Sequence, residues 1–550
     1  MGIYEEWLSE VDDDNLHNEL ISMDETAKEN AFYKELSFGT GGLRGILGAG
    51  TACMNQYVVA RATQGLSNYI KNNYSKRDWK VAVGYDTRLM SKEFSEVVCK
   101  VLALNSISSY VYEEPMPTPC VSFAIRELNC CCGVVITASH NPSKYNGYKV
   151  YNEKGCQITN EAADLIYSEI KKSDYFFDYS QYNTNYIENI PDKVYKKYLD
   201  LVEKVKVKDV KDTSVKIVYT PLNGTGLKPV TDILKRIGYS NIILVKEQEA
   251  HDGHFPTCSK PNPEEVSAMD LGIKYAKEND ADIVLATDPD CDRVSIAIKT
   301  NEDYRILSAN ELGCLLLDYI CANSSFNNGV FCKTIVTTDM AELIAQHYKL
   351  RTINVLTGFK YIGEKMDEVG DKFVFGFEES CGFLKGTFVR DKDAVIASML
   401  ICEMFANYKN EGITLIDKLN GLYKQYGYCL NTQHSYTFEG AKGNKIISEL
   451  MDSFRYEVQS IGKHKIILKK DYLQGIDNLP KSNVIKMYLD NNCSIIVRSS
   501  GTEPKLKCYF SIIQDTESQS KQVEKELADA INEFIDLKTQ MISEGAVTNK

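Results

Sequence analysis

A serine, a histidine and a lysine lie close together in the segment 137–149, TASHNPSKYNGYK. The apolar run 133–136 comes directly before this segment and predicts a buried strand. An Asn-Pro and an Asn-Gly pair are turn signals, so Ser139 should lie in a loop past the strand's carboxyl end, where open α/β sheets bind ligands. Ser139 beside the imidazole of His140, with Lys149 further on, has the parts of an activated nucleophile with an acid or base partner. A polar turn that bonds its own backbone is the competing interpretation.

Three aspartates, Asp288, Asp290 and Asp292, alternate between two apolar runs that predict strands. Their oxygens can converge on one hard cation, and such ligands suit Mg²⁺ or Mn²⁺. An EF-hand loop begins in the same way, but here its sixth position is Arg293 and its twelfth is Lys299, which excludes that calcium site. An acidic surface turn is the alternative, although three close carboxylates repel one another without a counter-ion.

The glycine-rich segment 38–45, FGTGGLRG, is predicted to form a loop that carries Arg44. It fails the dinucleotide-binding pattern, because Arg44 occupies the third glycine position and no strand precedes it, and it lacks the lysine of a P-loop. Glycines allow the backbone to approach a ligand closely, and the arginine offers a planar fork to a phosphate. A flexible turn with a solvated arginine explains the same residues.

Two further loops have polar groups that can bind hydroxyl groups in one case and a phosphate in the other. In the segment 376–382, GFEESCG, Glu378 and Ser380 can accept and donate hydrogen bonds to hydroxyl groups, although a capped turn is equally plausible. In the segment 498–504, RSSGTEP, Arg498 can grip a phosphate with two donors while hydroxyls and turn amides add more. An ordinary turn at a strand end is the alternative for this loop.

The elements that must position these loops form alternating strands and helices. At 550 residues the chain is too long for one core. Strand and helix patterns alternate three times, which predicts three successive α/β domains with mixed, largely parallel sheets. The last segment has long helices and a predicted hairpin at 484–497, which indicates an α+β domain. The expected domains are 1–208 with an acidic helical arm and the serine loop, 209–325 with the aspartates, 326–432 with the sugar loop and 433–550 with the phosphate loop.

Composition excludes several classes of protein. The net charge of −13, from 63 basic and 76 acidic residues, argues against binding to nucleic acid. No apolar run approaches the roughly 20 residues of a membrane span, and the acidic N-terminus does not resemble a signal peptide. The 17 cysteines are scattered, so we expect buried free thiols and a cytoplasmic protein. Neither the acidic arm nor the Cys130–Cys132 cluster, which lacks zinc-site spacing, has a functional interpretation.

The segment around Ser139 closely resembles the active-site loop of the α-D-phosphohexomutases, the phosphoglucomutase and phosphomannomutase family. The other four segments resemble loops of that family in the family's order, so the resemblance covers nearly the whole chain. The segments FGTGGLRG and GFEES resemble the corresponding segments in one branch of the family, which holds longer phosphoglucomutases and phosphopentomutase-like members. The resemblance implies four domains arranged around a central cleft, each contributing a loop.

The resemblance also implies a role for each residue. Ser139 would carry a phosphoryl group, and Mg²⁺ would be held by Ser139, Asp288, Asp290 and Asp292. The other catalytic residues that it implies are His140, Lys149 and Arg44. The substrate-binding residues that it implies are Arg293, Thr357, Gly358, Lys360, Glu378, Ser380, Arg498, Ser499, Ser500, Gly501 and Thr502.

The activity that the resemblance implies is reversible exchange between glucose 1-phosphate and glucose 6-phosphate. Glucose 1,6-bisphosphate would be both the intermediate and the activator, and the protein would be a monomer or a homodimer. Phosphopentomutase and phosphomannomutase activities are alternatives, and a sugar-bisphosphate synthase is another. A non-catalytic paralogue that binds sugar phosphates should have lost the serine, an aspartate or the phosphate-loop arginine, and none is lost here. A sugar kinase would need a P-loop, which we do not find.

Overall fold

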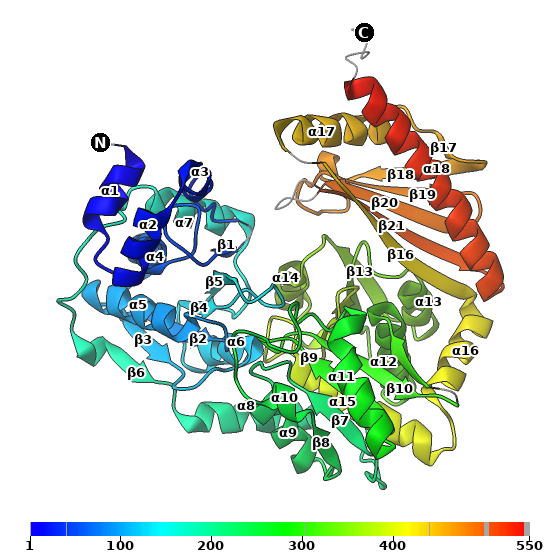
Figure 1. Cartoon of the computed structure of the whole chain (residues 1–550). Coiled ribbons are helices and arrows are strands. Elements are labelled where there is room, and N and C mark those ends of the chain that lie inside the picture. Colours follow the sequence, from blue (N-terminus) through cyan, green and yellow to red (C-terminus); the bar gives the residue numbers. More distant parts are fainter. Residues whose placement is uncertain (1, 40, 302, 439, 500–504, 544–550) are drawn as a thin grey trace. The chain divides into compact units, whose positions relative to one another are not determined.

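The computed structural model divides the chain into two compact units (Figure 1). Unit 1 contains residues 1–309 and 359–410, and unit 2 contains residues 310–358 and 411–550. The predicted third domain, 326–432, is therefore shared between the two units, and the four predicted boundaries stay a prediction. The structure describes residues 2–39, 41–301, 303–438, 440–499 and 505–543.

The first sheet of unit 1 is mixed, with the strand order β1-β5-β4-β2-β3-β6. Strands β4, β2, β3 and β6 run parallel, whereas β5 is antiparallel to both β4 and β1. The strand predicted at 133–136 is present as β4. The strands are β1 (Gly42–Ile46), β2 (Lys80–Tyr85), β3 (Ser108–Val111), β4 (Cys132–Ile136), β5 (Tyr145–Asn152) and β6 (Ile187–Asn189). The helices are α4 (Gln56–Asn73), α5 (Ser91–Leu104), α6 (Thr118–Glu127), α7 (Asn160–Ile170) and α8 (Asp192–Lys204).

Two strands of this sheet lie where the sequence predicted loop or turn. The glycine-rich segment contributes β1, which places Arg44 on a strand, and the second turn signal lies within β5. Gly147 explains the error, because a Cβ there would lie 2.6 Å from the carbonyl oxygen of Thr137 and 2.8 Å from that of Leu43. This glycine allows close backbone approach to neighbouring strands, and it does not mark a turn.

The N-terminal arm packs on the first sheet's helical layer, as predicted. It consists of α1 (Ile3–Glu10), α2 (Asp14–Ser22) and α3 (Glu25–Phe32). Trp7 of α1 is fully buried. Its ring contacts those of Tyr57 on α4 and of Phe176, with centroids 5.8 and 5.3 Å away. Such aromatic contacts dominate the burial that holds a short helical arm in place.

The second sheet of unit 1 has the order β11-β10-β9-β7-β8. Strands β8, β7 and β9 are parallel, and β9, β10 and β11 are antiparallel. The turn between β9 and β10 holds the three aspartates, so both predicted flanking strands are confirmed. The elements are β7 (Ile217–Thr220), α9 (Leu227–Arg236), β8 (Ile242–Leu244), α10 (Lys246–Glu249), α11 (Val266–Asn279), β9 (Ile283–Thr287), β10 (Val294–Lys299) and β11 (Tyr304–Leu307).

The remainder of unit 1 is a hairpin between two helices. Strands β14 and β15 pair antiparallel, with Glu378 opposite Gly382 at the turn. The elements are α14 (Phe359–Val369), β14 (Phe373–Glu378), β15 (Gly382–Leu384) and α15 (Ala394–Asn410).

Unit 2 combines a parallel strand pair with a six-stranded antiparallel sheet of order β16-β21-β20-β19-β18-β17. The predicted hairpin at 484–497 is β19 and β20. Helices α17 and α18 bury apolar residues, such as Phe454 and Ile531, in the same core as the strands. The elements are α12 (Ala309–Ala322), β12 (Val330–Thr334), α13 (Met340–His347), β13 (Arg351–Val355), α16 (Leu415–Tyr426), β16 (Tyr428–Thr437), α17 (Gly440–Tyr456), β17 (Ser460–Ile461), β18 (His464–Asp471), β19 (Val484–Leu489), β20 (Cys493–Ser499), β21 (Lys505–Gln514) and α18 (Glu517–Ser543).

A buried ion network joins the parallel strand pair of unit 2 to its antiparallel sheet. Lys333 on β12 is fully buried and lies 3.1 Å from a carboxylate oxygen of Glu342. Asp339 accepts hydrogen bonds from Lys486 Nζ at 2.8 Å and from Ser494 Oγ at 2.9 Å, both on the sheet. Although burial opposes it, the charges of Lys486 and Lys333 lower the pKa of Asp339 to about 2. This carboxylate therefore stays charged and ties the two parts of unit 2 together.

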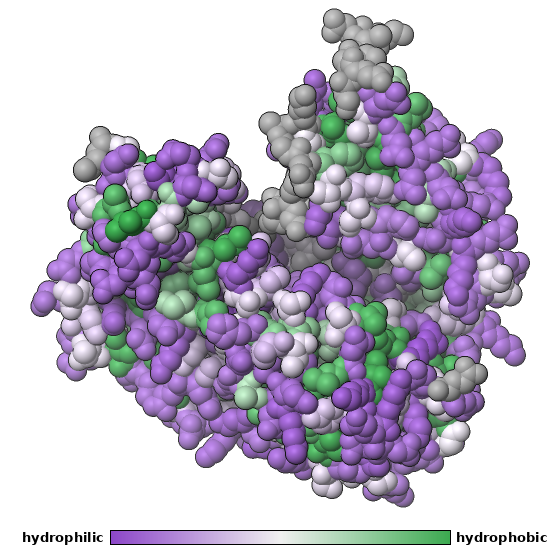
Figure 2. Space-filling model, viewed as in Figure 1, coloured by the Kyte–Doolittle hydropathy of each residue, from purple (hydrophilic) through white to green (hydrophobic). Residues whose placement is uncertain are grey.

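The face of the molecule drawn in Figure 2 is mostly hydrophilic, with apolar residues in a few small groups. Among the described helices, none is long and apolar enough to span a membrane. All seventeen cysteines are free, and all except the half-buried Cys53 are buried, as the sequence predicted.

Candidate active site

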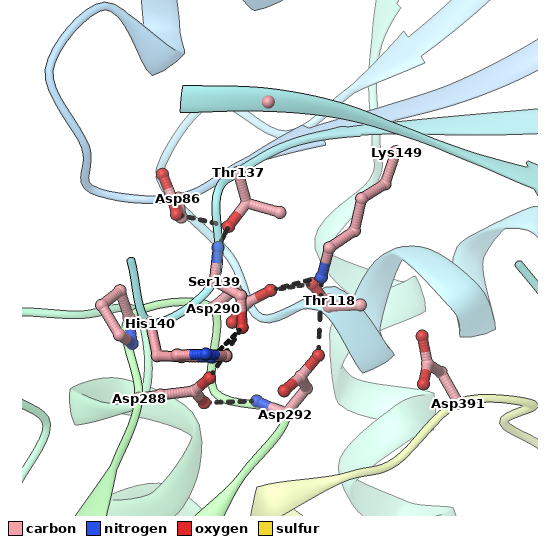
Figure 3. Close-up of polar contacts among 12 residues, drawn as sticks. Asp86, Thr118, Thr137, Ser139, His140, Lys149, Asp288, Asp290, Asp292 and Asp391 are labelled. Carbon is pink, nitrogen blue, oxygen red and sulfur yellow. Dashed lines mark hydrogen bonds and ion pairs between the residues drawn. The ribbon is translucent and has the colours of Figure 1, made fainter. Parts of the chain in front are cut away.

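Ser139 lies at the carboxyl end of β4, in the loop that leads to β5 (Figure 3). Its backbone is left-handed, with φ of 53°, which is uncommon for a residue with a side chain. Its Oγ donates a hydrogen bond to Asp288 Oδ2 at 3.1 Å and lies 3.1 Å from His140 Nδ1. The serine that the sequence singled out therefore contacts the aspartate loop directly.

A polar scaffold beneath the loop holds Ser139 in this conformation. The backbone N–H of Ser139 donates to Thr137 Oγ1 at 2.7 Å, and Thr137 Oγ1 donates to Asp86 Oδ2 at 2.6 Å (Figure 3). Asp86, which follows β2, also accepts from Ser91 Oγ and pairs with Arg88. Each of these groups is almost fully buried, so the hydrogen bonds replace water that the site excludes.

The three aspartates form one buried cluster. One carboxylate oxygen from each of Asp288, Asp290 and Asp292 lies within 4.8 Å of the others, and each residue is at most 1% exposed. The loop is braced internally, because the backbone N–H groups of Asp292 and Arg293 donate to Asp288 Oδ1. It is also joined to the first sheet, because Thr118 at the start of α6 donates from its Oγ1 to Asp290 Oδ2 at 3.2 Å (Figure 3).

Two lysines contact the cluster. Lys149 on β5 places its Nζ 2.8 Å from Asp290 Oδ2 and 3.6 Å from Asp292 Oδ2. Lys392, which the sequence analysis missed, places its Nζ 2.8 Å from the same oxygen of Asp292. Lys392 precedes α15 in the segment VRDKDA, where no motif or periodicity distinguishes it from a solvated lysine. Only its contact in the folded chain identifies it.

The pKa values of the cluster show an imbalance of charge. Burial and the charges of Asp292 and Asp290 raise the pKa of Asp288 well above its usual range. Burial and the charge of Asp290 likewise raise the pKa of Asp292. Burial opposes ionisation of Asp290 too, but Lys149 holds the pKa of that carboxyl well below its usual range. The carboxyl groups of Asp288 and Asp292 therefore favour further positive charge in the cluster.

This cluster fits a divalent metal ion. Asp290 Oδ1 and Asp292 Oδ1 are buried and accept no hydrogen bond from any described residue. Buried carboxylate oxygens without a partner are costly, and a cation would satisfy them. The ligands are all oxygens, which suits a hard cation such as Mg²⁺. Among the described residues, this is the one group of three acidic, histidine or cysteine side chains close enough to hold a metal.

Arg44 and Arg293 lie close enough to His140 of the serine loop for their charges to act on it. Burial and the charges of Arg293 and Arg44 lower the pKa of His140 well below its usual range, so its imidazole is neutral at physiological pH. Arg44 is exposed and its Nη1 donates to Asn141 Oδ1 at 3.4 Å. Arg293 forms an ion pair with Glu264.

The predicted sugar loop contributes a carboxylate of unusual pKa. Glu378 ends β14 and is 4% exposed. Burial raises its pKa to about 7, although the charges of Lys392 and Arg293 oppose the rise. Lys392 is also close in space, because a Cβ at Gly382 would lie 2.6 Å from Lys392 Cδ and 3.0 Å from Glu378 Oε1. Ser380 is half-buried in the turn that follows.

Of the other predicted substrate residues, one belongs to unit 1, four belong to unit 2 and three lie outside the described residues. Lys360, in the first turn of α14 in unit 1, donates from its Nζ to Asn160 Oδ1 at 2.9 Å, whereas Thr357 and Gly358 belong to unit 2. Gly358 has φ of 118° and nothing within 4 Å of where a Cβ would lie. Arg498 and Ser499 are the last residues of β20 in unit 2, so they lie on the strand and not after it. Ser500, Gly501 and Thr502 lie outside the described residues.

Family models match three successive parts of the chain. Residues 35–176 match phosphoglucomutase/phosphomannomutase, alpha/beta/alpha domain I. Residues 196–301 match domain II, and residues 308–426 match domain III. Together these matches cover well over half of the chain and agree with three successive α/β domains followed by a C-terminal α+β domain.

Curated relatives match over nearly the whole length. The phosphoglucomutase of Staphylococcus haemolyticus is 33% identical over 537 residues, covering 94% of this chain and 97% of the relative. That of Staphylococcus saprophyticus is 34% identical over 563 residues, covering 96% and 99%.

Solved structures support the fold. A putative phosphomannomutase from Thermus thermophilus has a TM-score of 0.71 at 17% identity and covers 92% of this chain and 99% of its own. Parafusin, a phosphoglucomutase from Paramecium in an open form, has a TM-score of 0.69 at 20% identity and covers 93% and 96%.

Proposed function

This chain belongs to the phosphoglucomutase/phosphomannomutase family, and we propose that it interconverts glucose 1-phosphate and glucose 6-phosphate. As a member of that family it is an isomerase that acts on a phosphosugar. The glucose ester is supported by the relatives, which are phosphoglucomutases at 33–34% identity. The observation that carries the proposal is the hydrogen bond from Ser139 Oγ to Asp288 in the buried carboxylate cluster.

Ser139 is the proposed carrier of the phosphoryl group. In the first half-reaction the bond between phosphorus and Ser139 Oγ breaks, and a bond forms from phosphorus to the free hydroxyl of the sugar phosphate. The product of this step is glucose 1,6-bisphosphate. In the second half-reaction Ser139 Oγ attacks the other phosphoryl group of the bisphosphate, which regenerates the phosphoserine and releases the isomeric ester.

Proton movement is assigned to three groups around Ser139. Lys149 lies in the cluster on β5, and we propose that it acts with His140 on the proton of the attacking sugar hydroxyl, which the neutral imidazole takes up. The lowered pKa of His140 supports this, because a neutral imidazole can accept a proton. The serine proton is already directed at Asp288 Oδ2 when Ser139 is free.

The cation proposed for the cluster is one Mg²⁺, held by Asp288, Asp290 and Asp292 with an oxygen of phosphorylated Ser139. When bound, it would supply positive charge beside the transferring phosphoryl group. Arg44 and Arg293 are proposed to hold the phosphoryl group or the sugar near this cluster. The exposed position of Arg44 beside the serine loop supports this role.

The sugar and the non-reacting phosphate need separate contacts. We assign the sugar hydroxyls to Glu378 and Ser380, and the buried carboxyl group of Glu378 supports this because its oxygens can form hydrogen bonds with hydroxyl groups. Thr357, Gly358 and Lys360 are proposed to contact the substrate as well. The phosphate is assigned to the segment 498–502: Arg498, Ser499, Ser500, Gly501 and Thr502.

The proposal also covers the compartment, the activator and the oligomeric state of the enzyme. Seventeen free cysteines suit a reducing compartment, so we propose a cytoplasmic enzyme. We propose glucose 1,6-bisphosphate as the activator, because it can phosphorylate Ser139 directly. A monomer or a homodimer remains the prediction for the oligomeric state, which light scattering would measure.

A coupled assay tests the substrate. Glucose 6-phosphate formed from glucose 1-phosphate is followed with Mg²⁺ and a trace of glucose 1,6-bisphosphate, with mannose 1-phosphate and ribose 1-phosphate in parallel. Preferred turnover of the glucose ester is expected. If the mannose or pentose ester is preferred, the proposed mechanism stands but the proposed substrate is wrong. Formation of bisphosphate without ester product would indicate a synthase. No turnover of any ester by folded protein would favour a non-catalytic paralogue.

A further inference from the structure

The guanidinium of Arg88 lies beneath the serine loop and donates hydrogen bonds to four backbone carbonyl groups in and next to the loop. Arg88 follows β2, and its side chain is fully buried. Its Nη2 donates to the carbonyl oxygens of Ser139 and Asn141. Its Nη1 donates to those of Pro142 at 3.0 Å and Tyr145 at 3.2 Å. Four carbonyl groups within seven residues of chain therefore converge on one side chain.

This arrangement needs the shape of arginine. A guanidinium offers five N–H donors in a planar fork, whereas an ammonium is a compact point charge with three. Buried carbonyl groups require a partner. Tyr145 begins β5, and the carbonyl of Pro142 also accepts from the N–H of Tyr145 at 3.0 Å, so Arg88 is the partner that all four carbonyl groups share. Arg88 also lies 3.3 Å from Asp86, the residue that anchors Thr137, so both sides of the loop share one support.

Ser139 depends on this support more than an ordinary loop residue would. Its left-handed backbone is disfavoured for residues with a Cβ and persists only where surrounding contacts impose it. The carbonyl of Ser139 accepts from Arg88, and its N–H donates to Thr137. The conformation that directs Oγ at Asp288 is thus fixed at both ends of the residue.

The segment between α10 and α11, which belongs to the domain of the second sheet, packs against the same guanidinium. The centre of the Phe255 ring lies 5.1 Å from Arg88 Cζ, and Phe255 is 1% exposed. Gly253 packs against the backbone, because a Cβ there would lie 2.4 Å from the N atom of Leu89. The part of the chain that carries the aspartates therefore also contacts the residue that shapes the serine loop.

We infer that Arg88 is the positioning residue of the serine loop, that it holds Ser139 in the left-handed conformation aimed at Asp288, and that Phe255 keeps it in place. This inference rests on the proposed transfer through Ser139. Arg88 touches no reacting atom. Its role is to fix a geometry, and misplacement of a reacting group by about 1 Å can cost about 100-fold in rate.

Arg88→Lys tests the inference, since it keeps the positive charge and removes the fork. The matched control is Arg126→Lys, because Arg126 Nη1 donates to the carbonyl oxygen of Lys154 outside the serine loop. We expect kcat for the glucose ester to fall about 100-fold in Arg88→Lys, with KM changed by less than about threefold. Binding of Mn²⁺ should stay within about threefold of the unaltered protein, because the three aspartates are intact.

Hydrogen exchange gives a readout that does not need activity. Amides of residues 139–146 should exchange at least about tenfold faster in Arg88→Lys, while amides of β9 and β20 and the control variant should not change. A kcat within about threefold of the unaltered enzyme, or unchanged exchange of the loop, would overturn the inference. If the unaltered protein turns over no ester, the proposed function is wrong. The exchange of residues 139–146 in Arg88→Lys then tests on its own whether Arg88 holds the serine loop.

Phe255→Leu covers the case in which Arg88→Lys does not fold. It keeps the guanidinium and removes the ring that covers it. We expect a milder loss of kcat, about five- to tenfold, with faster exchange of residues 139–146. An unchanged kcat together with unchanged exchange of the loop in this variant would refute the inference.

Discussion

Ser139 Oγ donates a hydrogen bond to Asp288 Oδ2 at 3.1 Å, although 149 positions separate the two residues in the chain. The serine follows β4 of the first sheet, and the aspartate follows β9 of the second. The loop ends of two α/β sheets therefore meet at one atom pair. A phosphoryl group on Ser139 would add negative charge beside three buried carboxylates, which requires a cation there.

Metal dependence follows from that charge. Chelation of divalent metal should abolish turnover, and Mg²⁺ should restore it. Asp290→Asn should weaken Mn²⁺ binding by at least about 100-fold, because even partners of metal ligands contribute 10- to 100-fold. Asp280→Asn, which changes an exposed aspartate of the same domain, is the control. Titration of Mn²⁺ by electron paramagnetic resonance measures both, and equal affinities would contradict the assignment.

The sugar contact assigned to Glu378 is tested by Glu378→Gln. Loss of the carboxyl group that binds the sugar hydroxyls should lower kcat/KM for glucose 1-phosphate about 10- to 100-fold, mostly through KM. Glu368→Gln is the matched control, because Glu368 is exposed and pairs only with Lys365 among its described contacts. Steady-state kinetics of the two variants decide. A KM unchanged in Glu378→Gln would remove this residue from the sugar site.

Several features of the site were predictable from local sequence. The buried strand before Ser139 and the strands around the aspartates came from apolar runs whose ends carry polar residues, and the structure confirms them. Oxygen-rich spacing at Asp288, Asp290 and Asp292 predicted a cluster, and their side chains do converge. These signals work because they depend on neighbouring residues.

Other features depend on distant residues and left no local signal. Gly147 looked like a turn residue, but the crowding of three strands is what requires a glycine there. Arg88 and Lys392 are single charged residues with no periodicity, and their partners lie 51 and 100 positions away. A sequence pattern cannot show which lysine or arginine is buried by the fold.

A buried aspartate outside the cluster predicts how stability varies with pH. Asp393, at the start of α15, accepts from Tyr198 OH at 2.8 Å, and burial raises its pKa to about 7 from 3.8. Between about pH 4 and pH 7 the folded state holds a proton that the unfolded state has lost, so stability falls as pH rises through this range. The loss is complete above about pH 7.

Asp393→Asn should remove this loss. We expect its Tm to exceed that of the unaltered protein by a few degrees at pH 8, with little difference near pH 4.5. Asp209→Asn, at an exposed position, should show no such change with pH. Thermal unfolding of both proteins is measured across this pH range. If the Tm difference between Asp393→Asn and the unaltered protein is no larger at pH 8 than at pH 4.5, the prediction is wrong.

The central claim is that the phosphoryl group passes through Ser139. Protein incubated with glucose 1,6-bisphosphate and Mg²⁺ should carry one phosphoryl group per chain on the peptide that contains Ser139, as measured by mass spectrometry. Excess glucose 6-phosphate should then remove it. Ser139→Ala should take up no phosphate and show no turnover, whereas Ser168→Ala, at an exposed serine, should behave like the unaltered enzyme. Turnover by Ser139→Ala, or turnover without phosphate on Ser139, would contradict the account.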